Sequence, residues 1–255
     1  MGVQGVFTKE LDIALLNQKA DIAVHSLKDV PTVLPKGLIL AAVLERGSSD
    51  DILVHRAGFN PSENKNAMIA TSSIRRRSQW LHRYPAHKLV NVRGNVQTRL
   101  RKFQEEGWDG IIFAKAGLER LGLLPMHFIV LDWMIPAPAQ GAIAIICCDD
   151  NKLVYDACRK INHEDSEIVV SVERDFLYHL EGGCSVPISA FAFLKGDQII
   201  FQGAVHSLDG SQEMTVEVRT RKEKWKTVGQ EAAMQVKQSD KGKVILDEFR
   251  KLGRV

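Results

Sequence analysis

Apolar and polar positions in the first 150 residues are spaced in a way that predicts short strands joined by helices. Around the middle of this region strand-like and helix-like runs alternate, which is typical of a parallel sheet with helices on its faces. The expected strands are 21–25, 38–44, 52–55, 68–70, 88–92, 110–114 and 142–147, the last returning to the first unit. The expected helices are 8–19 (with Thr8 as its N-cap), 73–83, 95–105 and 115–121.

The pattern changes after residue 150. A long helix is expected at 165–180, with an apolar face made of Ile168, Val169, Val172, Phe176 and Leu180. Alternating strands are expected at 186–194, 198–206 and 212–220, followed by helices at 226–237 and 241–252. This order predicts an α+β unit with a small antiparallel sheet, in contrast to the α/β pattern before it.

Composition restricts the class of protein. The 255 residues are 45% hydrophobic and 25% charged with a net charge of +3, as in an ordinary globular protein. No apolar run approaches the roughly 20 residues that cross a bilayer, and the first residues lack a signal-peptide pattern. The cysteines Cys147, Cys148, Cys158 and Cys184 form no C-x-x-C pair, so no metal site is expected, and Cys147 and Cys148 are expected to be buried. These features predict a soluble, cytoplasmic protein without a membrane partner.

Polar side chains follow the strand expected at 21–25, in the stretch His25-Ser26-Leu27-Lys28-Asp29-Val30-Pro31. Pro31 excludes a helix here and favours an extended Val30. Lys28 and Asp29 are therefore expected on a short loop at a strand end, where α/β folds bind ligands. An ionised carboxylate there could stabilise a positive charge that develops in a substrate. A solvated turn with a local ion pair fits the same residues.

Basic residues are concentrated between Thr71 and Arg101, a window without Asp or Glu. They are Arg75, Arg76, Arg77, Arg83, Lys88, Arg93, Arg99 and Arg101. Two helices are expected to begin at Ser73 and Asn95, and free N–H groups at helix starts bind anions. Arginine binds a carboxylate through two parallel hydrogen bonds, so several arginines on one cleft would suit a substrate with several carboxylates. A solvated basic helix face and nucleic-acid binding are the alternatives.

The stretch Glu181-Gly182-Gly183-Cys184-Ser185-Val186-Pro187 joins the long helix to the antiparallel sheet. Its two glycines end the helix and permit positive φ angles. Cys184 is therefore expected on a loop, unlike the other three cysteines. A cysteine there could form a permanent thioether or act as a nucleophile, and a structural cysteine is the other interpretation.

Six motifs in order along nearly the whole chain resemble the porphobilinogen deaminase (hydroxymethylbilane synthase) family. They are the stretch 25–31 above, Thr71-Ser72-Ser73-Ile74-Arg75-Arg76, Val92-Arg93-Gly94-Asn95-Val96-Gln97-Thr98-Arg99-Leu100, Ala116-Gly117-Leu118-Glu119-Arg120-Leu121-Gly122, Gln140-Gly141-Ala142, and the stretch 181–187. The resemblance implies a transferase of tetrapyrrole and heme biosynthesis. It would join four porphobilinogen molecules head to tail, with loss of ammonia, into the linear hydroxymethylbilane.

The resemblance also implies roles for individual residues. Cys184 would carry a dipyrromethane cofactor through a thioether bond, and Asp29 would be the catalytic carboxylate that stabilises the cation left when ammonia departs. The implied cofactor-binding residues are Cys184, Lys28, Ser72, Ser73, Arg75, Arg76, Arg93, Gly94 and Arg99. The implied substrate-binding residues are Phe7, Ser26, Arg75, Arg76, Arg99, Arg120 and Gln140. No metal is implied.

The implied architecture is two periplasmic-binding-protein-like α/β domains around a cleft, with a small α+β C-terminal domain that contains an antiparallel three-stranded sheet. Domain 1 would comprise 1–46 and 139–160, domain 2 would comprise 47–138, and domain 3 would comprise 161–255. A monomer is implied, with porphobilinogen as its small-molecule partner and no nucleic acid.

The sequence departs from the family pattern in two ways. Family members carry a strand and a helix ahead of the point where this sequence starts. Without them a strand of domain 1 would lack a neighbour and expose an apolar sheet edge. Gln4 also stands where the family usually has a lysine. The rival hypothesis is therefore a catalytically impaired homologue, or an anion-binding protein of the same fold.

Overall fold

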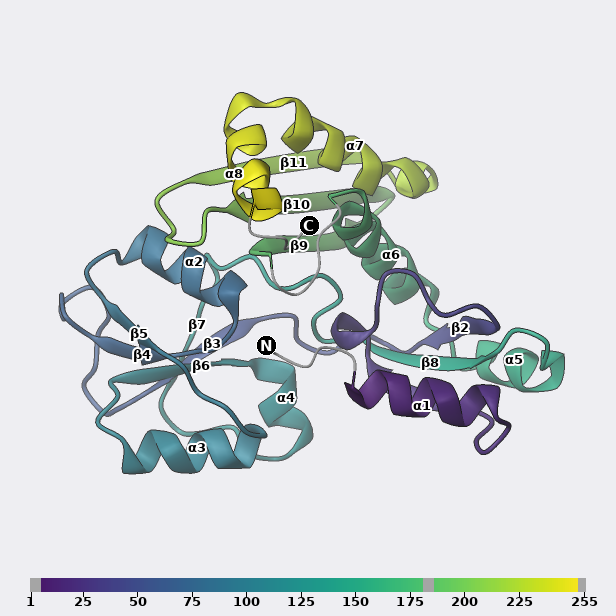
Figure 1. The fold of residues 1–255 in the computed structure, drawn as a ribbon, viewed down its shortest axis with the longest axis horizontal. Helices are drawn as coiled ribbons and strands as arrows, with labels where there is room; N and C mark the ends of the chain where they lie inside the picture. The colour runs from purple at the N-terminus through teal and green to yellow at the C-terminus, as the bar shows by residue number, and fades with distance from the viewer. Residues whose placement is uncertain (1–5, 181–185, 252–255) are drawn as a thin grey trace.

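The computed structural model describes residues 6–180 and 186–251, which form three sheets with helices packed against them (Figure 1). The helices are α1 (Val6–Leu16), α2 (Ile74–Arg83), α3 (Val96–Glu105), α4 (Lys115–Arg120), α5 (Lys152–Arg159), α6 (Glu164–His179), α7 (Trp225–Gln238) and α8 (Asp240–Lys251), with 3-10 turns η1 (Leu27–Asp29) and η2 (Lys222–Lys224). The strands are β1 (Ala23–Ser26), β2 (Leu38–Val43), β3 (Asp51–His55), β4 (Met68–Ala70), β5 (Lys88–Val90), β6 (Gly110–Ala114), β7 (Phe128–Val130), β8 (Ile143–Cys148), β9 (Ile188–Lys195), β10 (Gln198–His206) and β11 (Glu213–Arg221).

The first sheet has the order β1-β8-β2, and both of its strand pairs are antiparallel. The strand expected at 142–147 therefore does return to the first unit, where it lies in the middle of the sheet. β1 is at the edge of this sheet among the described residues, and Val24 is 53% exposed there.

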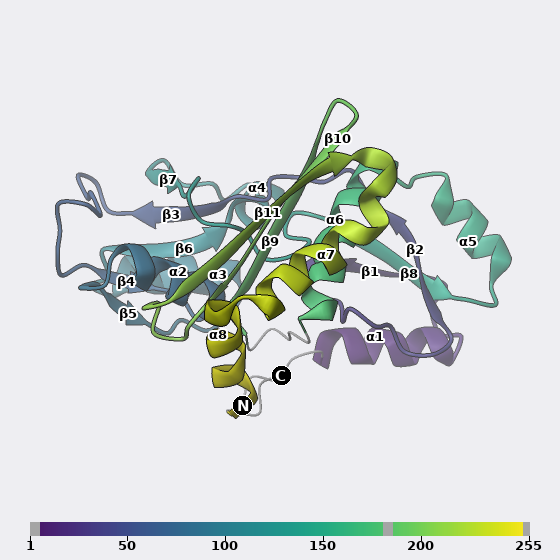
Figure 2. The same ribbon diagram turned by 90° about the horizontal axis from the view of Figure 1, so that it is seen from above.

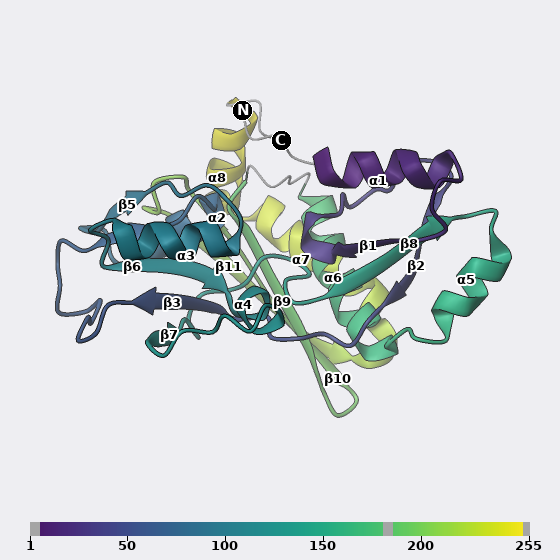
Figure 3. The same cartoon turned by 90° about the horizontal axis from the view of Figure 1, so that it is seen from below.

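The second sheet has the order β5-β4-β6-β3-β7. β4 runs parallel to β5 and β6, as the alternation predicted, whereas β3 runs antiparallel to both β6 and β7. Both faces are apolar: Ile52 and Ile111 face a core that includes residues of α3 and α4, while Leu53 and Ile112 face the core that contains Trp80 of α2. Figure 3 shows α3 on the face opposite α2.

The third sheet is an antiparallel meander with the order β11-β10-β9, as predicted. α6 and α7 pack against it, and α7 runs alongside the strands of the sheet in Figure 2. The five residues expected on the apolar face of α6 are all buried, and the ring centroids of Phe176 and Phe201 are 5.1 Å apart. One continuous core joins the first and third sheets through α6.

A buried ion pair joins the two connections between the first and second sheets to α6. Arg46 contacts Glu173 through Nη1 at 2.6 Å and Nη2 at 3.1 Å, and its Nε donates to the carbonyl of Gln140 at 2.9 Å. The carboxylate of Glu173 also accepts from the backbone N–H groups of Ala139 and Ala192. Burial raises the pKa of Glu173, while Arg46 opposes that change. Residues 46, 139 and 140 are thus held together beside β9.

Some sequence predictions were wrong in detail. Thr8 is not the N-cap of the first helix, because α1 already begins at Val6. β7 and α5 were not predicted, and both are short: β7 has three residues and α5 has eight. Cys147 is buried as expected, but Cys148 is partly exposed.

Within the described ranges, no helix has the length and apolar character needed to cross a membrane. The same residues contain no group of three or more His, Cys, Asp or Glu side chains that could hold a metal ion.

Candidate functional site

A cavity of about 590 Å³ lies where the three sheets meet. Its lining comes from the η1 turn, the segments that begin α2 and α3, the connection between the second and first sheets, and both ends of the segment between α6 and β9. The lining residues are Lys28, Asp29, Thr71, Ser72, Ser73, Arg75, Arg76, Val92, Arg99, Ile112, Ala137, Pro138, Gln140, Leu177, Val186 and Ile188. Cationic and hydroxyl side chains predominate among the polar groups.

The Lys28–Asp29 turn follows directly from β1. Leu27 is fully buried, and its N–H donates to the carbonyl of Ala142 at 3.0 Å. The turn closes when Val30 donates to the carbonyl of Leu27, and Val30 is extended ahead of Pro31. The prediction of a short loop at a strand end is confirmed, with the Asp29 side chain exposed at the cavity.

The ammonium group of Lys28 lies in a strongly cationic environment. Burial lowers its pKa to about 8, and the positive charge of Arg76 acts in the same direction. Asp29 and Asp51 oppose this change. Lys28 therefore loses its charge at a pH much closer to neutrality than an ordinary lysine does.

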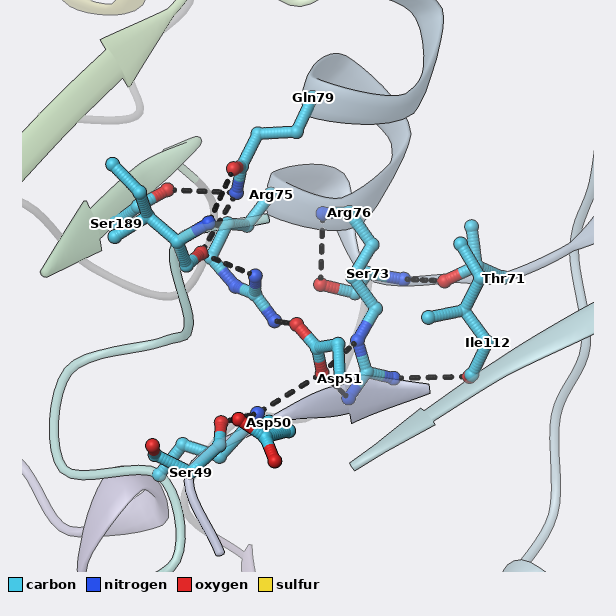
Figure 4. Close-up of polar contacts among 12 residues, drawn as sticks. Ser49, Asp50, Asp51, Thr71, Ser73, Arg75, Arg76, Gln79, Ile112 and Ser189 are labelled. Carbon is cyan, nitrogen blue, oxygen red and sulfur yellow. Dashed lines mark hydrogen bonds and ion pairs between the residues drawn. The ribbon is translucent and has the colours of Figure 1, made fainter. Parts of the chain in front are cut away.

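Arg75 and Arg76 are buried and share one carboxylate, that of Asp51 (Figure 4). Arg75 Nη2 lies 2.6 Å from Asp51 Oδ2, and Arg76 Nη2 lies 2.8 Å from Asp51 Oδ1. Each arginine also donates to one backbone carbonyl, Arg75 through Nη1 to Ile135 and Arg76 through Nη1 to Ile112. Burial alone would raise the pKa of Asp51, but the two arginines lower it to about 2. The carboxylate is thus ionised at any ordinary pH.

The start of α2 is built from hydroxyl side chains. Ser73 is the N-cap, and its hydroxyl accepts from the N–H of Arg76. Ser72 Oγ donates to the carbonyl of Val92 at 2.8 Å and accepts from the N–H of Val92 at 2.9 Å. These bonds fix the loop after β4 against the loop after β5, so the N-terminal end of α2 borders the cavity.

The start of α3 brings Arg99 to the cavity. Asn95 is the N-cap, and Arg99 Nε donates to the carbonyl of Gly94 at 2.7 Å. Gly94 has φ of +119°, and a Cβ atom there would lie 2.6 Å from Cγ2 of Thr98. Only glycine fits this position without strain. Burial lowers the pKa of Arg99, and the charge of Arg76 lowers it further.

The structure brings together eight of the residues that the sequence singled out: Lys28, Asp29, Ser72, Ser73, Arg75, Arg76, Arg99 and Gln140. It does not place Ser26, Arg93, Gly94 or Arg120 in the cavity lining, and Arg120 instead donates to the carbonyl of Gly141 at 2.6 Å. The side chain of Phe7, and the whole of Gln4 and Cys184, lie outside the described residues.

Sequence reasoning missed Asp51, which holds two of the predicted arginines in place. The available signal was the acidic pair Asp50-Asp51 directly before the apolar run Ile52-Leu53-Val54, because a charge at the start of a buried strand needs a partner. Two cavity-side polar atoms remain without a partner among the described residues, namely Arg75 Nε and Gln140 Oε1.

Comparisons with known proteins agree with the resemblance. The family model "Porphobilinogen deaminase, dipyromethane cofactor binding domain" matches residues 1–156, and "Porphobilinogen deaminase, C-terminal domain" matches residues 168–238. The porphobilinogen deaminase of Syntrophomonas wolfei is 40% identical, over 98% of this chain and 83% of its own length. That of Campylobacter hominis is 45% identical, over 83% of this chain and 70% of its own length.

The solved structures that match include a TRAP periplasmic solute binding protein from Desulfovibrio salexigens. It is 14% identical, with a TM-score of 0.40, over 62% of this chain and 59% of that chain.

Proposed function

This chain belongs to the porphobilinogen deaminase family, and we propose that the cavity between its three sheets is where the family's reaction takes place. The reaction joins four porphobilinogen molecules head to tail, releases ammonia at each addition and yields the linear tetrapyrrole hydroxymethylbilane. One observation carries the proposal: Asp29 lines the same cavity as Lys28, Arg75, Arg76 and Arg99. Asp29 thus lines the same cavity as a cationic wall formed by these four side chains.

Asp29 is the proposed catalytic residue. Loss of ammonia from porphobilinogen leaves a positive charge on the substrate, and a fixed carboxylate beside that charge lowers the energy of the transition state. Asp29 can also accept hydrogen bonds from pyrrole N–H groups. Its side chain is exposed at the cavity on a turn whose backbone is held in place, which suits such a preorganised role.

The cationic wall is the proposed binding site for acetate and propionate groups. Arg75 and Arg76 each donate to Asp51, so they act as fixed charges, and the buried Arg75 Nε has no hydrogen-bond partner among the described residues. Lys28, Ser73 and Arg99 complete this wall. For Ser26, Phe7, Arg93, Gly94 and Arg120, contact with cofactor or substrate stays a prediction from the resemblance.

The dipyrromethane cofactor of the family fits the polar groups of this cavity. Its carboxylates require cations and its pyrrole N–H groups require acceptors, and the cavity offers the buried donor Arg75 Nε and the buried acceptor Gln140 Oε1. Leu177 and Val186 line the cavity on either side of residues 181–185 in the sequence. We propose that Cys184 holds the cofactor through a thioether bond. When bound, the cofactor supplies the carbon to which the first substrate is added.

The domain bounds are part of the proposal. We assign the first sheet to domain 1 (1–46 and 139–160), the second to domain 2 (47–138) and the third to domain 3 (161–255).

We also propose a cytoplasmic monomer that does not bind nucleic acid. Light scattering coupled to size-exclusion chromatography tests the monomer, since a dimer would elute with twice the mass.

The proposed activity is tested by incubating the purified protein with porphobilinogen and measuring ammonia and the tetrapyrrole product. The expected result is one ammonia released per porphobilinogen consumed, with a linear tetrapyrrole as the product. Folded protein that carries the cofactor and yet releases no ammonia would contradict the proposal.

A further inference from the structure

Arg174 of α6 contacts the Lys28–Asp29 turn, although 144 residues separate Arg174 from Val30 in the sequence. Its Nη1 donates to the carbonyl of Val30 at 2.9 Å and to that of Leu27 at 3.3 Å. Its Nη2 donates to the carbonyl of Pro31 at 2.6 Å. One guanidinium group therefore binds three carbonyl oxygens at the end of the turn that carries Asp29.

Arg174 has no carboxylate partner among the described residues. Burial lowers its pKa to about 10, and no acidic neighbour opposes that change. A partly buried cation without a counter-ion is unfavourable on its own. Its contacts instead satisfy the carbonyls of Val30 and Pro31, which directly follow the turn, and add a second donor to the carbonyl of Leu27.

Within residues 6–180 and 186–251, the turn makes few other hydrogen bonds to its surroundings. The N–H of Val30 donates to the carbonyl of Leu27 within the turn. The N–H of Leu27 donates to the carbonyl of Ala142, which lies outside the turn. The carbonyls of Val30 and Pro31 are held by Arg174. A planar guanidinium can hold several acceptors in fixed directions at once, which a lysine cannot do.

The same helix links the turn to the rest of the site. Glu173, the neighbour of Arg174, binds Arg46 and the backbone of Ala139 and Ala192. α6 ends at His179, shortly before the sequence segment that contains Cys184. Two adjacent residues of α6 thus hold the connections between the sheets and the turn with Asp29.

We propose that Arg174 is a positioning residue for the reaction: it fixes the backbone of the turn so that the Asp29 carboxylate is held in place at the cavity. Arg174 acts through Asp29 and does not itself touch the substrate. The proposal rests on the function proposed above, in which Asp29 is catalytic.

The test compares kcat and KM for Arg174→Ala, Arg174→Lys and the control Arg219→Ala. Arg219 is an exposed arginine on β11 whose ion pair is with Glu217. A displacement of about 1 Å in a reacting group costs on the order of 100-fold in rate, so Arg174→Ala is expected to lower kcat by about 10- to 100-fold with little change in KM. Arg174→Lys is expected to recover part of this loss, and Arg219→Ala is expected to match the unchanged protein.

A double mutant separates positioning from general destabilisation. If Arg174 acts through Asp29, adding Arg174→Ala to Asp29→Asn lowers the residual rate no further. If the rate losses of the two single variants multiply in the double mutant, the proposal is overturned. An unchanged kcat in folded Arg174→Ala would also overturn it. If Arg174→Ala does not fold, Arg174→Gln takes its place in both comparisons. Full activity in Asp29→Asn would refute the catalytic role of Asp29. That result concerns the proposed function and is distinct from a failure of the Arg174 proposal.

Discussion

Asp51 Oδ1 accepts two hydrogen bonds from the guanidinium of Arg76, from Nε at 3.0 Å and from Nη2 at 2.8 Å. Oδ2 of the same carboxylate accepts from Arg75 at 2.6 Å. One fully buried acid therefore fixes two neighbouring arginines at the cavity wall. Their positive charge is in place before any ligand arrives, which is the preorganisation that binding of a polyanion requires.

Asp51→Asn is expected to lower the free energy of unfolding by about 3–5 kcal/mol, because it leaves two buried arginines without a counter-charge. Urea unfolding at neutral pH measures this loss. Asp156→Asn is the matched control, since Asp156 pairs with Lys152 on the exposed face of α5. The control is expected to change stability by less than about 0.5 kcal/mol. Equal losses in the two variants would contradict the structural role of Asp51.

Lowering the pH should remove the contribution of Asp51 to the free energy of unfolding in the unmodified protein. The pKa of Asp51 is lowered from 3.8 to about 2 in the folded state, so its contribution is complete above about pH 4 and is lost as the pH falls toward 2. The lost contribution is on the order of 2 kcal/mol. The stability difference between the unmodified protein and Asp51→Asn should therefore shrink only on the acid side of pH 4.

Asp29→Asn is expected to reduce turnover by about 100- to 1,000-fold, because the amide keeps the shape of the side chain but cannot stabilise a developing positive charge. The exposed side chain makes no contact on which the fold depends, so the unfolding midpoint should stay the same. Ammonia release and thermal unfolding measured on the same sample separate the two effects. Near-normal turnover would rule out Asp29 as the charge-stabilising group.

Binding of carboxylates by Lys28 is expected to weaken as the pH rises through about 8. Burial and Arg76 lower the pKa of Lys28 to that value, so the ammonium loses its proton there and its attraction for anions disappears. KM measured against pH should therefore rise above pH 8. Lys28→Arg should move this rise to higher pH, because a guanidinium keeps its proton. An identical pH profile in Lys28→Arg would assign the rise to another group.

Gly94→Ala is expected to destabilise the loop before α3 by about 1–3 kcal/mol. The added Cβ would meet Thr98 at 2.6 Å, in a backbone conformation with φ of +119°. Gly107→Ala is the matched control, because a Cβ there has open space. Since Arg99 donates to the Gly94 carbonyl, the first variant should also raise KM. Equal stability of the two variants would contradict the close packing at Gly94.

Much of the fold followed from the sequence because its elements have clear periods and caps. Ser73 and Asn95 begin helices where their side chains predicted, and the Lys28–Asp29 turn lies at a strand end because Pro31 stops any helix. Strand order was not predictable in the same way. β8 lies between β1 and β2, although about 100 residues or more separate it from either strand in the sequence.

The ion-pair partners at the site were harder to predict than the location of the site. The arginine-rich window has no acid within it, so Arg75 and Arg76 looked free, yet their partner Asp51 lies more than 20 residues upstream. Glu173 and Arg174 lie outside the apolar face predicted for this helix, but Glu173 is fully buried and Arg174 bonds a distant turn. Such pairings depend on tertiary contacts, which local sequence patterns do not encode.

The most direct test of the account is the intact mass of the purified protein compared with that of Cys184→Ser. The account predicts that the unmodified protein exceeds its sequence mass by one dipyrromethane and that Cys184→Ser does not. This would identify Cys184 as the attachment residue, and Leu177 and Val186, which flank residues 181–185 in the sequence, line the cavity together with Asp29. A folded protein with its bare sequence mass, or an excess that persists in Cys184→Ser, would contradict the proposed site.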